Sequence, residues 1–479
     1  MIFNSLEFAL FLPIVFILYW FVTQRNLKTQ NWLIVTASYF FYGWWDWRFL
    51  SLIAFSSVVD YLIGLRLSKE ETSQIKKKTL LWTSICINLG FLGFFKYYNF
   101  FAESFSDAFT FLGYSIDPTR LNIILPVGIS FYTFQTLSYT IDVYRKKLKP
   151  TKDLGVFLAF VSFFPQLVAG PIERATNLLP QFTIKRIFNY SSSVDGLRQI
   201  LWGLFKKVVI ADSCAEYANI IFENYESLSG STLFLGAVFF AFQIYGDFSG
   251  YSDIAIGTAR LFGFRLMKNF AFPYFSRDIA EFWRKWHISL STWFRDYLYI
   301  PLGGSKGSRF KQIRNIFIIF IVSGFWHGAN WTFIAWGALN AVYFLPLLLL
   351  NKNRKNLDNA ASSKFLPSFQ EFISIGITFF LTTIAWVFFR AESLPKAIDY
   401  VSEIFSSSIV SLPEIRPLNL ITLLGVFIFF EWIGRHNEYG IEKLGLNWKK
   451  PIRWILYGVL SVIIFSQLGN EQPFIYFQF

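Results

Sequence analysis

The stretch Gly324-Phe325-Trp326-His327-Gly328-Ala329-Asn330-Trp331 places a histidine inside a long apolar run. The flanking residues 316–322 and 332–350 carry no charged side chain. An ionisable group at membrane depth costs a few kcal/mol on insertion scales, and such groups usually mark a functional site. Because the whole chain contains only three histidines, His327 is the first candidate for a functional residue.

The composition around this stretch is that of a polytopic membrane protein. Of 479 residues, 54% are hydrophobic and only 16% are charged, and the chain contains 60 Phe and 17 Trp. This bias predicts an all-α membrane protein. The net charge of +13 is better explained by basic cytoplasmic loops than by nucleic-acid binding, since the aromatic residues lie in apolar runs and not among basic residues.

Apolar stretches predict about eleven membrane spans plus re-entrant pieces, with about 20 residues for each full span. Some stretches are interrupted, as at Pro126 and Pro165, and broken helices are tolerated only where protein or a water-filled cavity satisfies the backbone. Basic clusters between the early helices predict an N-terminus on the outer side. The candidate spans are residues 6–22, 31–45, 48–66, 79–98, 121–141, 153–170, 231–246, 315–328, 331–350, 369–390, 417–434 and 453–468.

We predict one membrane domain over residues 1–479. It divides into N-terminal helices, a catalytic core, a polar and basic loop that is the clearest linker, and C-terminal helices (1–170, 171–350, 351–368 and 369–479). Cys86 and Cys214 lack the spacing of a zinc site or a disulfide framework. The N-terminus has no basic region of the signal-peptide kind, so its first apolar stretch is expected to be a retained helix.

A moderately polar segment over residues 243–304 stands out in this apolar chain. It begins with Asp247, Tyr251 and Asp253 among Ser and Gly residues. One interpretation is a polar path or acceptor site inside the helical bundle. The other is a set of helix caps and a Gly-rich bend, in which the two carboxylates bind backbone amides. The sequence favours neither.

The next block, residues 276–289, reads as an amphipathic interfacial helix rich in Trp and basic residues. On helical spacing Trp283 and His287 share a face, as do Arg284 and His287. A basic stretch over residues 306–314 follows and should face the cytoplasm, where it could meet an anionic acyl donor. Taken alone, this stretch is better explained by ordinary positive-inside topology.

His327 follows inside the membrane zone. A neutral imidazole can accept one proton and donate another, which suits a general base for a hydroxyl that attacks an acyl donor. A lone histidine in an apolar helix is otherwise structural, but a second membrane-zone histidine, His287, favours chemistry. Asn330 and Trp331 could orient the ring or a carbonyl. His436 lies in a polar loop and is expected to be solvated.

These residues resemble the membrane-bound O-acyltransferase (MBOAT) family, and within it the bacterial alginate O-acetylase branch. The resemblance covers essentially the whole chain, without departure at either histidine. The matching blocks are residues 164–172, 243–264, 269–304, 323–340 and 473–479.

The resemblance implies a ring of helices, thinned at its centre, with a tunnel from a cytoplasmic donor side to the opposite face. It implies that His327 is the catalytic histidine and His287 a second functional position, with Trp326, Asn330 and Trp331 shaping the pocket. It further implies a multi-pass protein of the bacterial inner membrane that takes acetyl groups from acetyl-CoA or an acyl carrier. A separate periplasmic or extracellular acetyltransferase would pass them to a polysaccharide such as alginate or to a cell-wall polymer. No metal and no bound cofactor are expected.

Three other functions compete with this one. A D-alanyl transferase that acylates teichoic acid would share the fold. A transporter of polysaccharide or lipid would also use broken helices and intramembrane polar groups, although paired inverted segments are not evident here. A structural scaffold for a polysaccharide synthase would make both histidines dispensable.

Overall fold

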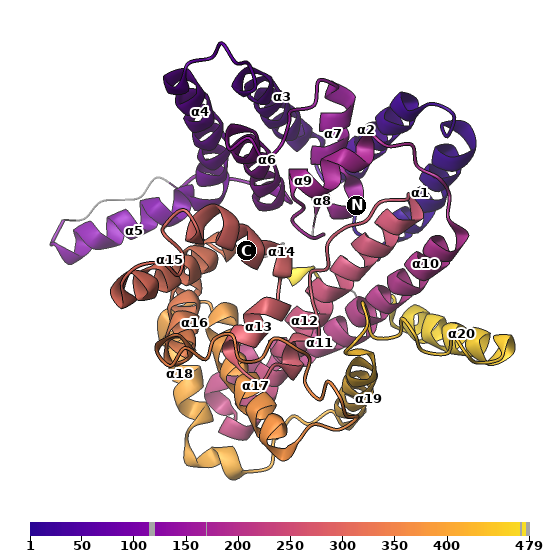
Figure 1. Cartoon of the computed structure of the whole chain (residues 1–479). Helices are drawn as coiled ribbons and strands as arrows, with labels where there is room; N and C mark the ends of the chain where they lie inside the picture. The colour runs from indigo at the N-terminus through magenta and orange to yellow at the C-terminus, as the bar shows by residue number, and fades with distance from the viewer. Residues whose placement is uncertain (115–119, 169, 470–471, 476–479) are drawn as a thin grey trace. The chain divides into compact units, whose positions relative to one another are not determined.

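The computed structural model describes residues 1–114, 120–168, 170–469 and 472–475, and every regular element in them is a helix (Figure 1). The prediction of an all-α protein is therefore confirmed. Five helical stretches in this part of the chain are long and apolar enough to cross a membrane: Trp47–Leu67, Gln74–Phe111, Gly230–Leu261, Trp331–Leu349 and Phe369–Arg390. Shorter apolar helices cover Leu6–Val22, Leu154–Leu167 and Leu418–Gly434. The count of eleven spans, the ring and the tunnel stay predictions.

The chain divides into two compact units. Unit 1 consists of Met1–Ser193 with Thr258–Met267, and unit 2 consists of Val194–Gly257 with Lys268–Phe479. The helices α10 (Tyr190–Leu204) and α12 (Gly230–Leu261) contribute residues to both units. The prediction of one domain over the whole chain stays a prediction.

Unit 1 holds the N-terminal helices. They are α1 (Leu6–Ile17), η1 (Leu18–Val22), α2 (Leu27–Gly43), η2 (Trp47–Phe49), α3 (Leu50–Leu67), α4 (Gln74–Leu92), η3 (Gly93–Tyr97), α5 (Tyr98–Phe111), α6 (Ile129–Tyr144), α7 (Leu154–Ser162), α8 (Phe164–Leu167), α9 (Ala175–Leu178) and η4 (Leu179–Phe182). Side chains just before several helices accept the first free backbone N–H groups, as Asn26 does for α2 and Asp153 for α7.

A buried polar network joins α3, α4 and α6, which pack against one another (Figure 1). The carboxylate of Asp60 accepts hydrogen bonds from Ser84 at 2.5 Å, Asn88 at 2.8 Å and Thr140 at 3.3 Å. Because an unsatisfied polar group is expensive in hydrocarbon, these bonds connect the three helices.

The span predicted over residues 121–141 begins later than expected, because α6 starts only at Ile129. Pro126 has no backbone N–H to donate, and Gly128 has a φ of 74°, a left-handed conformation that does not continue a helix. A side chain at Gly128 would also meet the carbonyl oxygen of Leu167 at 2.6 Å. The predicted interruption near Pro165 is confirmed, since α7 and α8 are separate helices.

Unit 2 holds the remaining helices. They are η5 (Phe205–Ala211), α11 (Asp212–Glu223), η6 (Tyr225–Ser227), η7 (Pro273–Phe275), α13 (Ile279–Lys285), α14 (Ile288–Phe294), η8 (Arg295–Tyr299), α15 (Arg309–His327), α16 (Trp331–Leu349), α17 (Phe369–Arg390), α18 (Leu394–Ile404), η9 (Ser407–Val410), α19 (Leu418–Gly434) and α20 (Lys450–Gln467).

The long helix α12 corrects one interpretation of the polar segment. It continues as one helix for 32 residues, through Asp247, Tyr251 and Asp253, so the expected helix caps at these residues are wrong. Its glycines allow close packing instead: a side chain at Gly250 would lie 2.7 Å from the carbonyl oxygen of Gly203 on α10. Small residues let membrane helices approach closely in this way.

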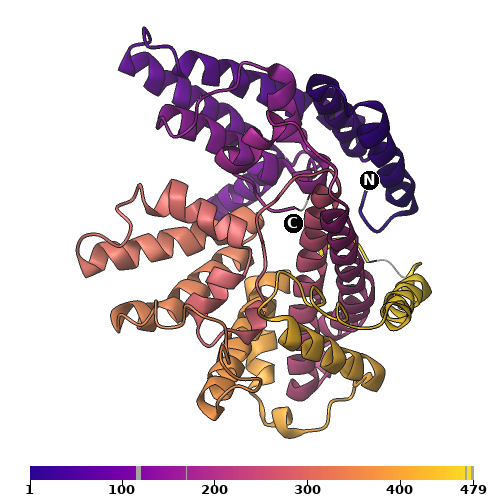
Figure 2. The same ribbon diagram turned by 45° about the vertical axis from the view of Figure 1, so that its right-hand side comes forward.

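The antiparallel pair α15 and α16 lies side by side in Figure 2 and makes the most extensive helix contact in unit 2. Two glycines allow this contact. A Cβ at Gly324 would lie 2.1 Å from the carbonyl oxygen of Phe333, and one at Gly337 would lie 2.3 Å from that of Phe320. Both clashes are with backbone, which cannot rotate away as a side chain can.

We therefore expect Gly337→Leu to lower the melting temperature of the purified protein, because the two helices must separate to admit the side chain. Overpacking of this kind costs about 1–3 kcal/mol, more than the roughly 1 kcal/mol that leucine gains over glycine in helix propensity. Gly90→Leu on α4 is the control, since a side chain there meets nothing within 4 Å. An unchanged melting temperature for Gly337→Leu would contradict this account of the contact.

Candidate active site

Both candidate histidines lie at breaks in helices of unit 2. His327 is the last residue of α15 and is 3% exposed. His287 lies between α13 and α14, is 1% exposed and has a φ of 43°, in the left-handed region that residues with a side chain seldom adopt. The single helix predicted over residues 276–289 is therefore wrong, and so are the shared helix faces that it assigned to Trp283, Arg284 and His287.

The break at His287 is imposed by a neighbouring segment of chain. The backbone N–H of Ala271 donates to the carbonyl oxygen of Lys285 at 3.0 Å, and that of Ile288 donates to the carbonyl oxygen of Asn269 at 2.8 Å. These two bonds occupy backbone groups on both sides of His287. They replace the bonds that a continuous helix would make.

The indole of Trp326 lies between the two histidines. Its ring centroid is 4.9 Å from that of His327 and 6.0 Å from that of His287. His327 also packs edge-on against Trp336 and Phe389, each with a centroid separation of 5.2 Å. The structure thus brings together His287, Trp326 and His327, which the sequence predicted as site residues, inside an aromatic cage that excludes bulk water.

Asn269 fixes the protonation pattern of His287. Its Oδ1 lies 3.1 Å from Nδ1 of His287 and also accepts the hydroxyl of Ser289 at 2.8 Å, while its Nδ2 donates to Ser252. Because Oδ1 can only accept, Nδ1 of His287 must carry the proton, and Nε2 is the basic nitrogen. Burial lowers the pKa of His287 to about 3, so the ring is neutral at physiological pH.

Asp247 and Asp253 on α12 form buried ion pairs with two lysines that the sequence analysis missed. Lys207 lies 2.8 Å from Asp247 and 2.7 Å from Asp212, and Lys206 lies 2.5 Å from Asp253. The side chain of Lys207 is 1% exposed. Both lysines are on η5, so the pairs with Asp247 and Asp253 connect η5 to α12, and the pair with Asp212 connects η5 to α11.

The ion pair of Lys207 and Asp247 also binds a segment near the C-terminus. The backbone N–H of Ile475 donates to Asp247 at 2.7 Å, and Lys207 donates to the carbonyl oxygen of Gln472 at 3.0 Å. The ring of Phe474 packs on Tyr251 with a centroid separation of 4.2 Å. Tyr251, a predicted site residue, therefore contacts the C-terminal segment of the protein.

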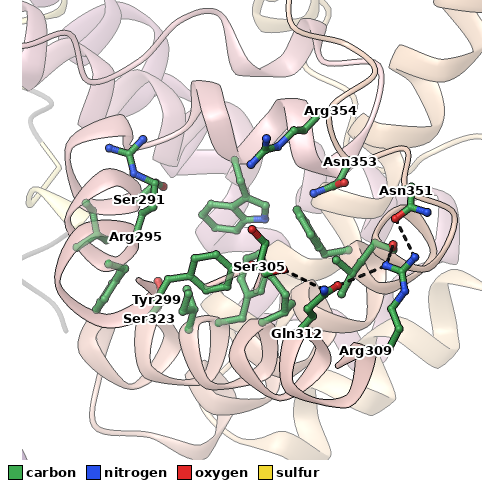
Figure 3. Close-up of a pocket in the computed structure, with 18 residues that line it drawn as sticks. Ser291, Arg295, Tyr299, Ser305, Arg309, Gln312, Ser323, Asn351, Asn353 and Arg354 are labelled. Carbon is green, nitrogen blue, oxygen red and sulfur yellow. Dashed lines mark hydrogen bonds between the residues drawn. The ribbon is translucent and has the colours of Figure 1, made fainter. Parts of the chain in front are cut away.

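Unit 2 contains a cavity of about 530 Å³, which is lined in part by residues of α15 (Figure 3). Its lining combines polar and basic side chains with apolar ones, and Ser323, one helical turn before His327 on α15, lies on its wall. Trp283, which also lines the cavity, packs on Trp336, and Trp336 in turn contacts His327. The polar lining consists of Ser291, Arg295, Tyr299, Ser305, Arg309, Gln312, Ser323, Asn351, Asn353 and Arg354, and the apolar lining of Trp283, Leu290, Phe294, Ile316, Ile319, Phe320, Phe344 and Leu348.

The loop over residues 351–368 is fastened to this site and is more than a linker. Arg284, a predicted site residue, donates to the carbonyl oxygens of Asn353 at 2.9 Å and Asn356 at 2.6 Å. Arg277 forms an ion pair with Asp358 at 2.9 Å. These bonds place the first part of the loop at the cavity, where it contributes Asn351, Asn353 and Arg354.

The other predicted residues lie outside the cavity lining. Asn330 caps α16 by accepting the N–H of Thr332 at 3.0 Å, and Trp331 is 54% exposed. His436 is exposed, as expected, and lies 3.3 Å from Asn359. Among the described residues, no group of three or more His, Cys, Asp and Glu side chains could hold a metal ion.

Comparison with known proteins identifies the family. The model of the MBOAT, membrane-bound O-acyltransferase, family matches residues 153–380, which include both histidines. The chain is also 37% identical to "Probable alginate O-acetylase AlgI" of Pseudomonas putida, over 100% of both proteins. The chain belongs to the membrane-bound O-acyltransferase family. This MBOAT chain is also 37% identical to "Peptidoglycan O-acetyltransferase" of Helicobacter pylori, over 86% of this chain and 81% of that protein. It is 30% identical to "Teichoic acid D-alanyltransferase" of Streptococcus thermophilus, over 60% and 75%.

The protein is thus a multi-pass membrane enzyme, an O-acyltransferase of the MBOAT family, and the resemblance seen in its sequence is confirmed. The family assignment favours an acyltransferase over the transporter and scaffold interpretations. Sequence reasoning missed Asn269, Lys206 and Lys207. The only available signal for the lysines was their position beside apolar residues 208–211, which is unusual for unpaired charges.

Proposed function

We propose that this enzyme transfers acetyl groups from a thioester donor, and that they reach hydroxyl groups of a polysaccharide or cell-wall polymer. Two relatives that match most of the chain are named as O-acetylating enzymes, one for alginate and one for peptidoglycan. The observation that carries the proposal is the buried His327, one helical turn from a serine that lines a cavity with three arginines in its lining.

The donor enters the cavity of about 530 Å³. Arg295, Arg309 and Arg354 line its polar part and would bind phosphate groups, for which the guanidinium fork is suited. The apolar remainder would take the thin, uncharged arm of the thioester. Acetyl-CoA and an acyl carrier's phosphopantetheine arm both have this chemistry. On this proposal the three arginines face the cytoplasm, in keeping with the positive-inside rule.

His327 acts as the general base. Its imidazole takes the proton of the acceptor hydroxyl while the hydroxyl oxygen forms a bond to the carbonyl carbon of the thioester. The carbon–sulfur bond then breaks, and the thiolate leaves with the proton from His327. The aromatic cage of Trp326, Trp336 and Phe389 keeps out water that would hydrolyse the thioester.

His287 plays a different part. Polarising the acyl carbonyl would require an N–H donor, but the proton of His287 is on Nδ1 and directed to Asn269. We therefore assign His287 to the acceptor side, where the basic Nε2 orients the incoming hydroxyl. The acceptor hydroxyl would carry the acetyl group, as its ester, to the opposite face of a bacterial inner membrane, where a separate periplasmic or extracellular acetyltransferase would transfer it to the polymer.

The donor site gives a direct prediction. We expect Arg354→Gln to raise the KM for acetyl-CoA about tenfold with little change in kcat, because losing one charged contact to phosphate costs about 1.4 kcal/mol of ground-state binding. The rates are measured with purified enzyme in proteoliposomes. Lys355→Gln, a neighbour outside the cavity lining, is the control. A lower kcat with unchanged KM would contradict the placement of the donor.

A further inference from the structure

A second cavity of unit 2, with a volume of about 720 Å³, lies between α12, α17 and α19. Its walls are aromatic and aliphatic, with Phe242, Phe379, Phe427 and Trp432 among them. The helices α12 and α17 are long and apolar enough to cross a membrane, and α19 is a shorter apolar helix. This groove differs from the donor cavity in having almost no polar lining and in sharing none of its residues.

Two glycines on facing helices widen the groove. Gly376 of α17 and Gly425 of α19 both line it, and a side chain built at either position would meet nothing within 4 Å. Both glycines therefore border space that the protein leaves unfilled. At 1.5 Å per residue, the lining residues of α17 from Phe372 to Phe379 cover about 10 Å, most of the roughly 15 Å depth of one hydrocarbon leaflet.

The rim of the groove carries a basic loop. Phe365, Leu366 and Pro367 line the groove, and the side chains of Phe365 and Leu366 are exposed. Lys364 precedes them directly and is exposed too. The loop over residues 351–368 contains four basic residues and one acidic residue (Lys352, Arg354, Lys355, Lys364 and Asp358).

We infer that this groove binds one acyl chain of an anionic phospholipid, with the phosphate group at the rim beside Lys364. The apolar walls match a hydrocarbon chain, and the glycines provide its width. The basic loop next to the rim favours a negatively charged headgroup, as basic surfaces at the cytoplasmic interface do in general. Tyr245 and Glu431, whose side chains are joined by a hydrogen bond, also line the groove, so the acyl chain covers this buried pair.

Native mass spectrometry of the detergent-purified, full-length protein tests this site. The protein is titrated with palmitoyl-oleoyl phosphatidylglycerol or with phosphatidylcholine of the same chains. We expect one phosphatidylglycerol to bind at clearly lower concentration than phosphatidylcholine. Gly376→Leu and Gly425→Leu, on two different helices, should each weaken binding of both lipids at least tenfold by filling the groove.

The charge is tested separately. Lys364→Gln should weaken phosphatidylglycerol binding about fivefold and leave phosphatidylcholine unaffected. Gly458→Leu on α20 is the matched control, since a side chain there also meets nothing within 4 Å. Binding of phosphatidylglycerol by both groove-filling variants at wild-type strength would overturn the site. Equal affinity of wild type for the two lipids would overturn the choice of an anionic headgroup.

Discussion

Replacing His327 with alanine is expected to lower the rate of acetyl transfer by about 100- to 10,000-fold, the usual contribution of a general base. The ring is buried at the end of α15 and packs on Trp326, Trp336 and Phe389. Among the described residues, the other imidazole near this cage is that of His287, whose ring centroid lies 6.0 Å from that of Trp326. Initial rates with acetyl-CoA in proteoliposomes measure the effect.

The alanine variant leaves a space but no unpaired charge, so we expect it to insert and purify like wild type. His327→Gln, which keeps most of the volume but supplies no base, should be as inactive as His327→Ala. His436→Ala, at an exposed position in a loop, should keep full activity. Activity of His327→Gln within a few-fold of wild type would show that the ring only fills space.

The second large effect is expected from Lys207→Met. This substitution leaves Asp247 and Asp212 buried without their shared cation, and removing one partner of a buried pair typically costs about 3–5 kcal/mol. The loss also frees the carbonyl oxygen of Gln472. We expect a strongly lowered melting temperature, or loss of the monodisperse protein on size-exclusion chromatography.

The triple variant Lys207→Met, Asp212→Asn, Asp247→Asn removes the stranded carboxylates and should regain much of the lost stability. Lys396→Met is the control on the surface. Its pair with Glu392 spans 2.6 Å but is exposed, so its loss should leave the melting temperature nearly unchanged. Equal effects of Lys207→Met and Lys396→Met would show that burial of the pair contributes nothing.

Apolar stretches in the sequence predict helices well where one uninterrupted apolar run forms the whole helix. The predicted span over residues 369–390 coincides with α17, and the span over residues 417–434 differs from α19 by one residue. The continuous helical run of α10, η5 and α11 was not predicted. It carries Lys206, Lys207 and Asp212, which lower its hydropathy, and the ion pairs of the two lysines with α12 become visible only when the helices are packed together.

The candidate active site was predictable in part, because one of its histidines lies in an apolar stretch. The unusual position of His327 in an apolar run predicted it as a functional residue, and its neighbour Trp326 was predicted to shape the pocket. The helix break at His287 was not predictable, because residues 284–288 contain neither Gly nor Pro. Backbone hydrogen bonds with Asn269 and Ala271, which are remote in sequence, create the break, and the side chain of Asn269 orients the imidazole.

The most direct test of the central claim is ester-linked acetate on the cell-surface polymer of a deletion strain. The strain is complemented with wild type, His327→Ala or His436→Ala, with each protein quantified in the membrane. The account predicts that wild type and His436→Ala restore acetate and that His327→Ala does not. Acetate restored by His327→Ala, or D-alanine in place of acetate as the ester lost on deletion, would contradict it.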